Sequence, residues 1–296
     1  MHRRLFSLGI GGMLVTAAVG APARPAGQDE SFRRIEAASG GRLGVFMLDT
    51  GSGRTLAYRA DERFPMCSTF KFLAAAFVVQ RADSGLDDLA RAVAIPPTAE
   101  LVPYSPVTGP NAGRTMAMAQ LCEAAVAVSD NTAANLMLAS FGGPAGLTGF
   151  ARALGDRVTR LDRNEPLLNE GTPGDERDTT TPAAMAGLMR KLLVDRTLEA
   201  ASRERLQAWL VGNTTGDRQI RAGLPPGWRV GDKTGSGGNG TSNDIAIVWP
   251  PATDAAPLLV TAYLTGATAA TVAQRQATLA AVGALVPEFA GVPAKG

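Results

Sequence analysis

The first candidate for chemistry is a serine followed three residues later by a lysine. Ser68 and Lys71 stand at the start of an almost wholly apolar stretch, 70–79, whose pattern predicts a helix buried within a domain. Residues three apart share one face of a helix, so the Lys71 amine can reach the Ser68 hydroxyl. A desolvated lysine can take the serine proton and make the hydroxyl a nucleophile. The same pair also occurs by chance at ordinary helix starts, so other segments must support it.

Two such segments follow along the chain. Ser-Asp-Asn at 129–131 falls between predicted helices at 115–128 and 131–141, so its side chains project from a helix junction. Lys-Thr-Gly at 233–235 ends a predicted strand, 228–234, and its glycine lets the backbone come close to a ligand. Each segment alone is typical of a surface turn. Together, in this order, with a helical context for the first two and a strand context for the third, the segments form a highly specific set.

Composition excludes several other kinds of site. The one histidine is His2, close to the N-terminus, so the rest of the chain cannot build a Ser-His-Asp triad or a histidine-ligated zinc site. Two cysteines are too few for a disulfide framework or a four-cysteine metal site. Lysine and arginine number 29 against 27 aspartate and glutamate, and the excess comes from the first 23 residues. We therefore expect no metal, no cofactor and no nucleic-acid partner.

The N-terminus reads as an export signal. Arg3 and Arg4 precede an apolar run at 5–19, and Ala-Pro-Ala at 21–23 has the form of a cleavage site. We expect residues 1–23 to be removed, which leaves a periplasmic or secreted protein without a stable membrane anchor. An uncleaved anchor is the alternative, and the arginine pair also resembles a twin-arginine signal.

Strands precede and follow a block of helices, which most simply forms one antiparallel sheet with the helical block inserted. A long polar segment, 160–181, interrupts the helices, and a loop of that length within a compact domain usually serves function. The glycines and proline at 142–144 are expected to end a helix. Strands are predicted at 41–49, 54–59, 228–234, 244–249 and 258–265, and helices at 68–79, 115–128, 131–141, 182–194, 202–211 and 269–285.

The motif set at 68–71, 129–131 and 233–235 resembles that of the class A serine β-lactamases. Other stretches that resemble the family are 41–44, 61–64, 165–169, 177–182 and 222–225. The resemblance covers most of the chain after the leader. It implies an α/β (α+β) fold, a five-stranded antiparallel sheet flanked by helices with an inserted all-helical domain, as in β-lactamases and transpeptidases.

The implied domains are a sheet domain and a helical one. Residues 24–62 and 212–296 form the α/β sheet domain, and residues 63–211 form the all-helical domain. The active site is expected between them.

By resemblance, the reaction is hydrolysis of the lactam amide of penicillins and cephalosporins, which confers β-lactam resistance. Ser68 attacks the carbonyl and forms an acyl-enzyme, and backbone N–H groups of Ser68 and Ser236 form the oxyanion hole. Ser129 passes a proton to the departing lactam nitrogen. Glu165 and Asn169 hold the water that hydrolyses the ester. Whether Lys71 or Glu165 takes the Ser68 proton stays open.

The resemblance also assigns substrate contacts and a loop clamp. Lys233, Thr234 and Ser236 bind the substrate carboxylate. Asn131 holds the acyl side-chain amide, and Tyr104 forms one wall of the cleft. The expected ion pair that clamps the ends of the loop is Arg163 with Asp178.

Three positions depart from the family pattern. Ser242 and Gln219 stand where family members carry an arginine for the substrate carboxylate, which leaves Arg275 or Arg218 to supply that charge, with Arg275 favoured. Gly237 stands where family carbapenemases often have a cysteine that pairs with the one before the nucleophile. Strong carbapenem hydrolysis is therefore not expected.

Two rival functions share part of the motif set. A DD-peptidase, or penicillin-binding protein, uses the same serine and lysines but lacks the Glu165 loop and usually keeps a membrane anchor. A non-hydrolysing β-lactam receptor domain also lacks a deacylating glutamate. The sequence favours the hydrolase, acting as a monomer on small β-lactam substrates.

Overall fold

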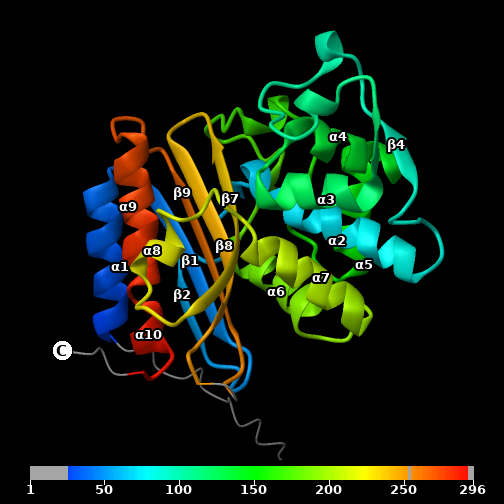
Figure 1. Ribbon diagram of the computed structural model, residues 1–296. Helices are drawn as coiled ribbons and strands as arrows, with labels where there is room; N and C mark the ends of the chain where they lie inside the picture. The colour runs from blue at the N-terminus through cyan, green and yellow to red at the C-terminus, as the bar shows by residue number, and fades with distance from the viewer. Residues whose placement is uncertain (1–25, 253–254, 293–296) are drawn as a thin grey trace, which may run out of the picture.

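The computed structural model describes residues 26–252 and 255–292, so the predicted leader and its cleavage site lie outside the described residues. One five-stranded antiparallel sheet forms the centre, as the sequence predicts, and its strand order is β2-β1-β9-β8-β7 (Figure 1). The last long strand of the chain therefore pairs with the first. The strands are β1 Arg42–Asp49, β2 Thr55–Tyr58, β7 Arg229–Gly237, β8 Thr241–Trp249 and β9 Leu258–Thr265.

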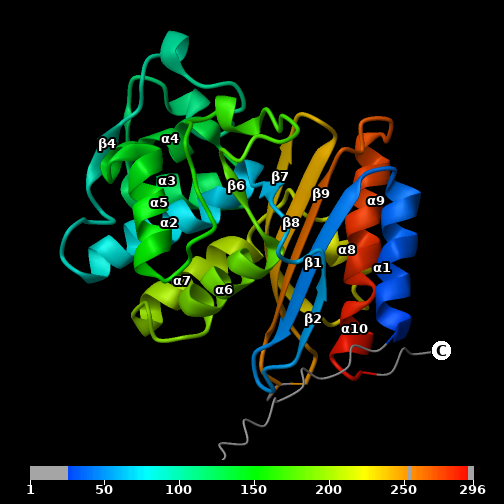
Figure 2. The ribbon, with the colours of Figure 1, turned by 180° about the vertical axis from the view of Figure 1, so that it is seen from behind.

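Terminal helices cover one face of the sheet, where α1 and α9 lie side by side (Figures 1 and 2). Phe32 of α1 and Leu279 of α9 are fully buried in a cluster that includes Val45 and Val260 from the strands. Removing these apolar side chains from water stabilises the layer, by about 1.5–3 kcal/mol for each large side chain. The helices on this face are α1 Ala26–Ser39, α8 Ile220–Gly223, α9 Val272–Gly283 and α10 Val286–Phe289.

A block of helices packs on the other face, with α2 in its middle (Figure 2). Residues at nearly every position from Phe70 to Val79 are buried, which agrees with the all-round apolar pattern of that stretch. Ile245 and Tyr263 join the same core from the sheet, so β8 and β9 are buried on both faces. The helices of the block are α2 Phe70–Asp83, α3 Met118–Ala127, α4 Asn131–Ser140, α5 Gly143–Ala153, α6 Pro182–Leu193 and α7 Ala200–Val211.

Short elements connect this block and set its loops. Two-stranded ladders join β3 to β6 and β4 to β5, and single 3-10 turns lie at the bends. The strands are β3 Phe64–Pro65, β4 Ala92–Ala94, β5 Thr115–Ala117 and β6 Thr179–Thr180, and the 3-10 turns are η1 Cys67–Thr69, η2 Thr98–Glu100, η3 Gly109–Asn111 and η4 Leu167–Asn169.

The sequence prediction was wrong at several elements. The helix expected from residue 115 begins only at Met118, because Thr115–Ala117 pair with β4. The glycines at 142–143 do follow α4, but they also start α5, which the sequence analysis missed along with α1. Strand β7 continues three residues further than predicted, to Gly237.

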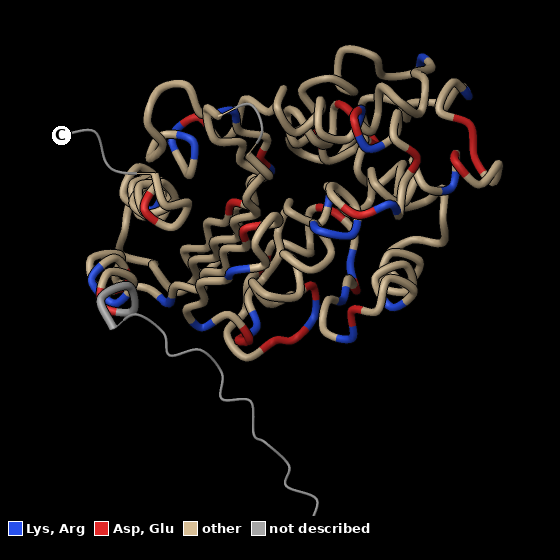
Figure 3. The backbone as a smooth tube through the Cα atoms, turned by 90° about the horizontal axis from the view of Figure 1, so that it is seen from below, with Lys and Arg blue, Asp and Glu red and all other residues tan. Residues whose placement is uncertain are grey.

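Acidic and basic residues are interspersed along the whole described chain (Figure 3). No helix among residues 26–252 and 255–292 is long and apolar enough to span a membrane.

Candidate active site

A cleft of about 370 Å³ brings together most of the predicted site residues. It lies where η1, the start of α4 and the end of β7 meet the loop 160–181. A larger hollow of about 640 Å³ contains none of the predicted site residues. The residues that line the cleft are Ser68, Tyr104, Ser129, Asn131, Asn169, Thr215, Gln219, Thr234, Gly235, Ser236 and Gln276.

Ser68 lies in the turn that leads into α2. It belongs to the 3-10 turn η1, so α2 itself begins at Phe70, two residues later than the sequence predicts. The preceding residue, Cys67, has a φ of 45°, in the left-handed region that side chains other than glycine rarely adopt. Such strain commonly marks a functional turn, and here it aims the serine into the cleft from beneath β7.

Gly235 lines the cleft and also lies against the turn that carries Ser68. A Cβ atom at this position would lie 2.8 Å from Met66 O and 3.2 Å from Ser68 N. The missing side chain therefore makes room for the nucleophile turn. Gly237 does the same one pleat further on, where a Cβ atom would lie 2.6 Å from Cys67 Sγ.

Lys71 is fully buried and is surrounded by acceptors. Its Nζ lies 3.0 Å from Glu165 Oε1 and donates to Ser129 O at 2.8 Å, Ser129 Oγ at 3.2 Å and Asn131 Oδ1 at 2.5 Å. Burial, the largest influence, lowers the pKa of Lys71, while the Glu165 carboxylate opposes this shift. The residue therefore loses a proton more readily than an exposed lysine.

Glu165 connects the lysine to the nucleophile. Ser68 Oγ donates to Glu165 Oε1 at 3.3 Å, the same oxygen that meets Lys71. The other carboxylate oxygen accepts from Asn169 Nδ2. Glu165 Oε1 thus bridges Ser68 and Lys71.

Asn135 fixes the backbone of Glu165. Its Oδ1 accepts from Glu165 N at 3.0 Å, and its Nδ2 donates to Glu165 O at 3.0 Å. The sequence analysis missed Asn135, although its position four residues after Asn131 places both on one face of α4.

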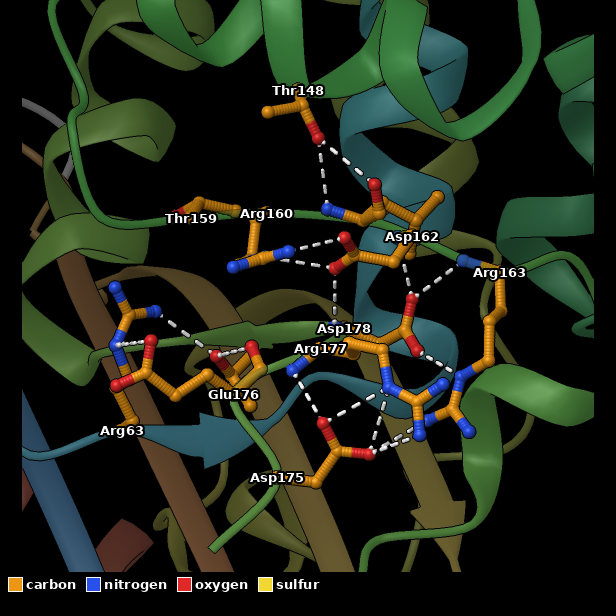
Figure 4. Close-up of polar contacts among 12 residues, drawn as sticks. Arg63, Thr148, Thr159, Arg160, Asp162, Arg163, Asp175, Glu176, Arg177 and Asp178 are labelled. Carbon is orange, nitrogen blue, oxygen red and sulfur yellow. Dashed lines mark hydrogen bonds and ion pairs between the residues drawn. The ribbon is translucent and has the colours of Figure 1, made fainter.

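The ends of the loop 160–181 are clamped by a charged pair (Figure 4). Arg163 Nε lies 2.6 Å from Asp178 Oδ2, the pair that the sequence predicts. Asp178 Oδ1 also accepts the backbone N–H groups of Asp162 and Arg163, at 2.7 and 2.9 Å. The aspartate side chain is 1% exposed, so this pair is shielded from water and holds the loop that carries Glu165.

Lys233 approaches the same cleft from β7. Its Nζ donates to Ser129 Oγ at 3.1 Å and to Thr234 O at 2.9 Å. Burial and the nearby Lys71 charge lower the pKa of Lys233 to about 7. Ser129 Oγ therefore accepts hydrogen bonds from two lysines. Their positive charges favour loss of the Ser129 proton, so this hydroxyl is suited to donate a proton to a substrate.

The neighbouring segment 129–131 also organises the loop opposite. Asp130 caps α4 by accepting from Ala133 N at 2.9 Å, and it accepts from the backbone of Val107 and Thr108. Asn131 Nδ2 donates to Pro103 O at 2.7 Å. This places Tyr104, 61% exposed, at the rim of the cleft.

The arginine expected at the substrate carboxylate does not line the cleft. Arg275 Nε donates to Ser242 Oγ at 3.3 Å, and Ser242 pairs with Ser236 across the sheet. Gln219 and Gln276 line the cleft at this end instead. The sequence analysis named Gln219 only as a position where family members carry an arginine, and it missed Gln276, because no spacing rule relates the end of β7 to α9.

Both cysteines are free and buried. Burial raises the pKa of the Cys67 thiol, which leaves it unreactive beside the nucleophile. Among the described residues, no group of histidine, cysteine, aspartate and glutamate side chains could hold a metal ion.

Comparison with known proteins places this site in a family. Residues 28–289 match the model of the β-lactamase enzyme family. The chain is 53% identical to β-lactamase AST-1 of Nocardia asteroides over 75% of this chain and 72% of that protein. It is 49% identical to β-lactamase CTX-M-8 of Citrobacter amalonaticus, over 80% of each chain.

Solved structures give the same result. An ancestral class A β-lactamase superposes with a TM-score of 0.85 at 57% identity, over 88% of this chain and 99% of that one. The putative class A β-lactamase PenP of Rhodopseudomonas palustris superposes with a TM-score of 0.86 at 56% identity, over 89% and 99%. The chain therefore belongs to the β-lactamase enzyme family, and it is a class A serine β-lactamase.

Proposed function

We propose that this enzyme opens the lactam amide of penicillins and cephalosporins through an acyl-enzyme on Ser68. The observation that carries the proposal is the position of Glu165 Oε1, 3.3 Å from Ser68 Oγ and 3.0 Å from Lys71 Nζ. One carboxylate is thus in contact with the nucleophile and with the buried ammonium group of Lys71. General bases must lie within hydrogen-bond reach of the proton they take, and Glu165 meets that condition.

In the first half-reaction, Ser68 Oγ bonds to the lactam carbonyl carbon and its proton moves to Glu165. Backbone N–H groups of Ser68 and Ser236, both on the cleft wall, stabilise the developing oxyanion. The carbon–nitrogen bond then breaks, and Ser129 gives its proton to the lactam nitrogen. Lys71, which contacts both Ser129 Oγ and Glu165 Oε1, gives a proton to Ser129 and takes up the proton on Glu165, so Ser129 is a hydroxyl and Glu165 a carboxylate again before the ester is hydrolysed.

In the second half-reaction, Glu165 and Asn169 orient a water against the ester. Glu165 takes a proton from the water, the new oxygen bonds to the carbonyl carbon, and Ser68 leaves with that proton. Asn169 lines the cleft and donates to Glu165, so it fixes the orientation of the base.

The substrate carboxylate lies at the β7 end of the cleft, where Lys233, Thr234 and Ser236 meet it. Thr215 supports this end, since its hydroxyl lies 2.5 Å from that of Thr234. Arg275 adds positive charge from behind Ser242.

At the opposite end, Asn131 holds the acyl side-chain amide, and Tyr104 forms the wall.

A chromogenic cephalosporin tests the proposal against its rivals. Hydrolysis predicts many turnovers per enzyme molecule. A single stoichiometric burst would instead indicate a penicillin-binding protein or a receptor domain that stays acylated. The deacylating arrangement of Glu165 and Asn169 favours the hydrolase.

The domain division, the export route and the oligomeric state are part of the same proposal. Residues 24–62 and 212–296 form the sheet domain and 63–211 the helical domain, and the cleft lies where elements of the two meet. We propose a monomer that is exported to the periplasm or medium after removal of residues 1–23. N-terminal sequencing of the exported protein tests the cleavage after Ala23.

A further inference from the structure

A hollow of about 530 Å³ lies outside the cleft, where the end of α5 meets the start of the loop 160–181. Four arginines line it together with a single carboxylate. The proposed mechanism uses none of these side chains. We call it the arginine hollow, and its polar lining consists of Arg63, Arg152, Arg157, Arg160, Thr148 and Asp162.

The fold brings these four cations to one short piece of backbone, 157–160. Arg63 Nη1 donates to Val158 O at 3.0 Å, and Arg152 Nη1 donates to Thr159 O at 2.7 Å. The two acceptors are adjacent carbonyls, so both guanidinium groups meet the same segment from different elements. The other two arginines are the first and last residues of that segment.

Two of the arginines are compensated by acids, as Figure 4 shows. Arg160 forms a two-point pair with Asp162, at 2.9 and 2.6 Å. Arg63 lies 3.9 Å from Glu176, whose side chain is 66% exposed, so water weakens this pair.

The other two arginines have no acidic partner in the described structure. Arg152 donates only to the carbonyls of Asp156 and Thr159, which carry no net charge. Arg157 is exposed and makes no hydrogen bond or ion pair with the described residues. The nearby Asp156 uses its Oδ1 on the backbone N–H groups of Val158 and Thr159. Positive charge and free N–H donors therefore remain at this hollow.

We propose that the arginine hollow binds a phosphate group or a similar multiply charged oxyanion. A guanidinium offers a planar pair of N–H donors that matches two oxygens of such an anion. Arg157 supplies its whole set of donors, and Arg152 supplies those not used on the backbone. The anion also offsets the positive charge of Arg152 and Arg157, which Asp162 and Glu176 leave uncompensated.

Calorimetric titration with inorganic phosphate, at neutral pH and constant ionic strength, tests the site. We expect saturable binding to the enzyme and at least a tenfold weaker affinity for Arg157→Ala. Arg157 is exposed and makes no hydrogen bond or ion pair with the described residues, so its removal should leave folding intact. The matched control is Arg196→Ala, because Arg196 is also exposed and unpaired in the described structure but does not line the hollow.

Two results would overturn the proposal. The first is a phosphate affinity that is the same in Arg157→Ala, Arg196→Ala and the parent, which would place any bound anion elsewhere, including the cleft. The second is an equal response to chloride at the same ionic strength, which would show general screening only. A parallel titration with glycerol phosphate separates the sources: tighter binding supports a phosphate ester as the ligand, and equal or weaker binding supports the free ion.

Discussion

Asn135 bonds both backbone groups of Glu165, with the N–H and the C=O each 3.0 Å from its side-chain amide. The same helix, α4, begins with Asn131, which accepts from Lys71. One helix thus fixes the base and the lysine relative to each other. Without this contact, the Glu165 side chain keeps its bonds to Ser68, Lys71 and Asn169, but its backbone loses both hydrogen bonds to α4.

We predict that Asn135→Ala slows the second half-reaction more than the first. Each lost hydrogen bond to a buried backbone group costs about 1–3 kcal/mol, and Glu165 then moves relative to the ester. kcat should fall about 10- to 100-fold, with the acyl-enzyme detectable in rapid-quench mass spectrometry. Asn135→Asp keeps the acceptor for Glu165 N but loses the donor to Glu165 O, so its loss should be smaller. A lower melting temperature with unchanged kcat would mean that Asn135 only stabilises the fold.

For Glu165→Ala, we predict an adduct on Ser68 that accumulates with a good penicillin. A general base contributes about 10²–10⁴-fold, so deacylation slows by that order and becomes limiting. Acylation persists, because Lys71 loses the carboxylate that raises its pKa and becomes the available base. Intact-mass spectrometry should show the adduct, and Ser68→Ala should show none. Turnover at the parent rate, or an adduct on another residue, would contradict the mechanism.

The pH dependence of substrate capture should report on Lys233. Burial and the Lys71 charge lower the pKa of Lys233 to about 7, so the free enzyme carries this positive charge below pH 7 and loses it above. For a β-lactam with a carboxylate, kcat/KM should therefore fall as the pH rises through about 7. Lys233→Arg keeps its charge at every accessible pH, so its alkaline limb should move upward by more than one unit. Superimposable profiles for the two enzymes would assign the limb to another group.

The spacing of Ser68 and Lys71 predicts that they lie close together, although Ser68 stands in the turn η1 that leads into α2. The other site residues were expected from the resemblance to the class A serine β-lactamases. The sheet was also predictable, because two sets of strands that precede and follow a helical block most simply pair into one antiparallel sheet.

Contacts between distant segments could not be predicted in the same way. Gly235 makes room for the turn at Ser68, and this depends on how β7 crosses η1. The start of α5 at Gly143 was missed because glycines and proline end helices more visibly than they begin them. Arg275 was expected to meet the substrate, but packing of α9 on the sheet directs its guanidinium to Ser242.

The place of Arg275 leads to a prediction for substrate binding. Acting from behind Ser242, its charge attracts the substrate carboxylate at a distance, so Arg275→Ala should raise KM about tenfold, the lower end of the effect of a charge-assisted contact. Arg218→Ala should leave KM unchanged, because Arg218 is exposed and does not line the cleft. If neither substitution changes KM, Lys233 and the hydroxyls suffice for the carboxylate.

Gly237 should be the most sensitive glycine of β7. A Cβ atom there would lie 2.5 Å from Asn169 O and 2.6 Å from Cys67 Sγ, closer than folded proteins allow. The first neighbour is backbone and cannot swing away, so Gly237→Ala must push η4 outward. Overpacking of this kind costs about 1–3 kcal/mol.

The displacement should also reach the chemistry. Asn169 donates to Glu165, so moving its backbone disturbs the group that orients the water. We predict a lower melting temperature for Gly237→Ala together with slower deacylation, measured by the decay of the acyl-enzyme after a short pulse of substrate. Gly187→Ala is the matched control, because a Cβ atom at this helical position meets nothing within 4 Å. Alanine favours a helix by about 1 kcal/mol over glycine, so the control should melt at the parent temperature or higher and deacylate normally. If Gly237→Ala also behaves like the parent, the packing of β7 against the loop does not control the position of Asn169.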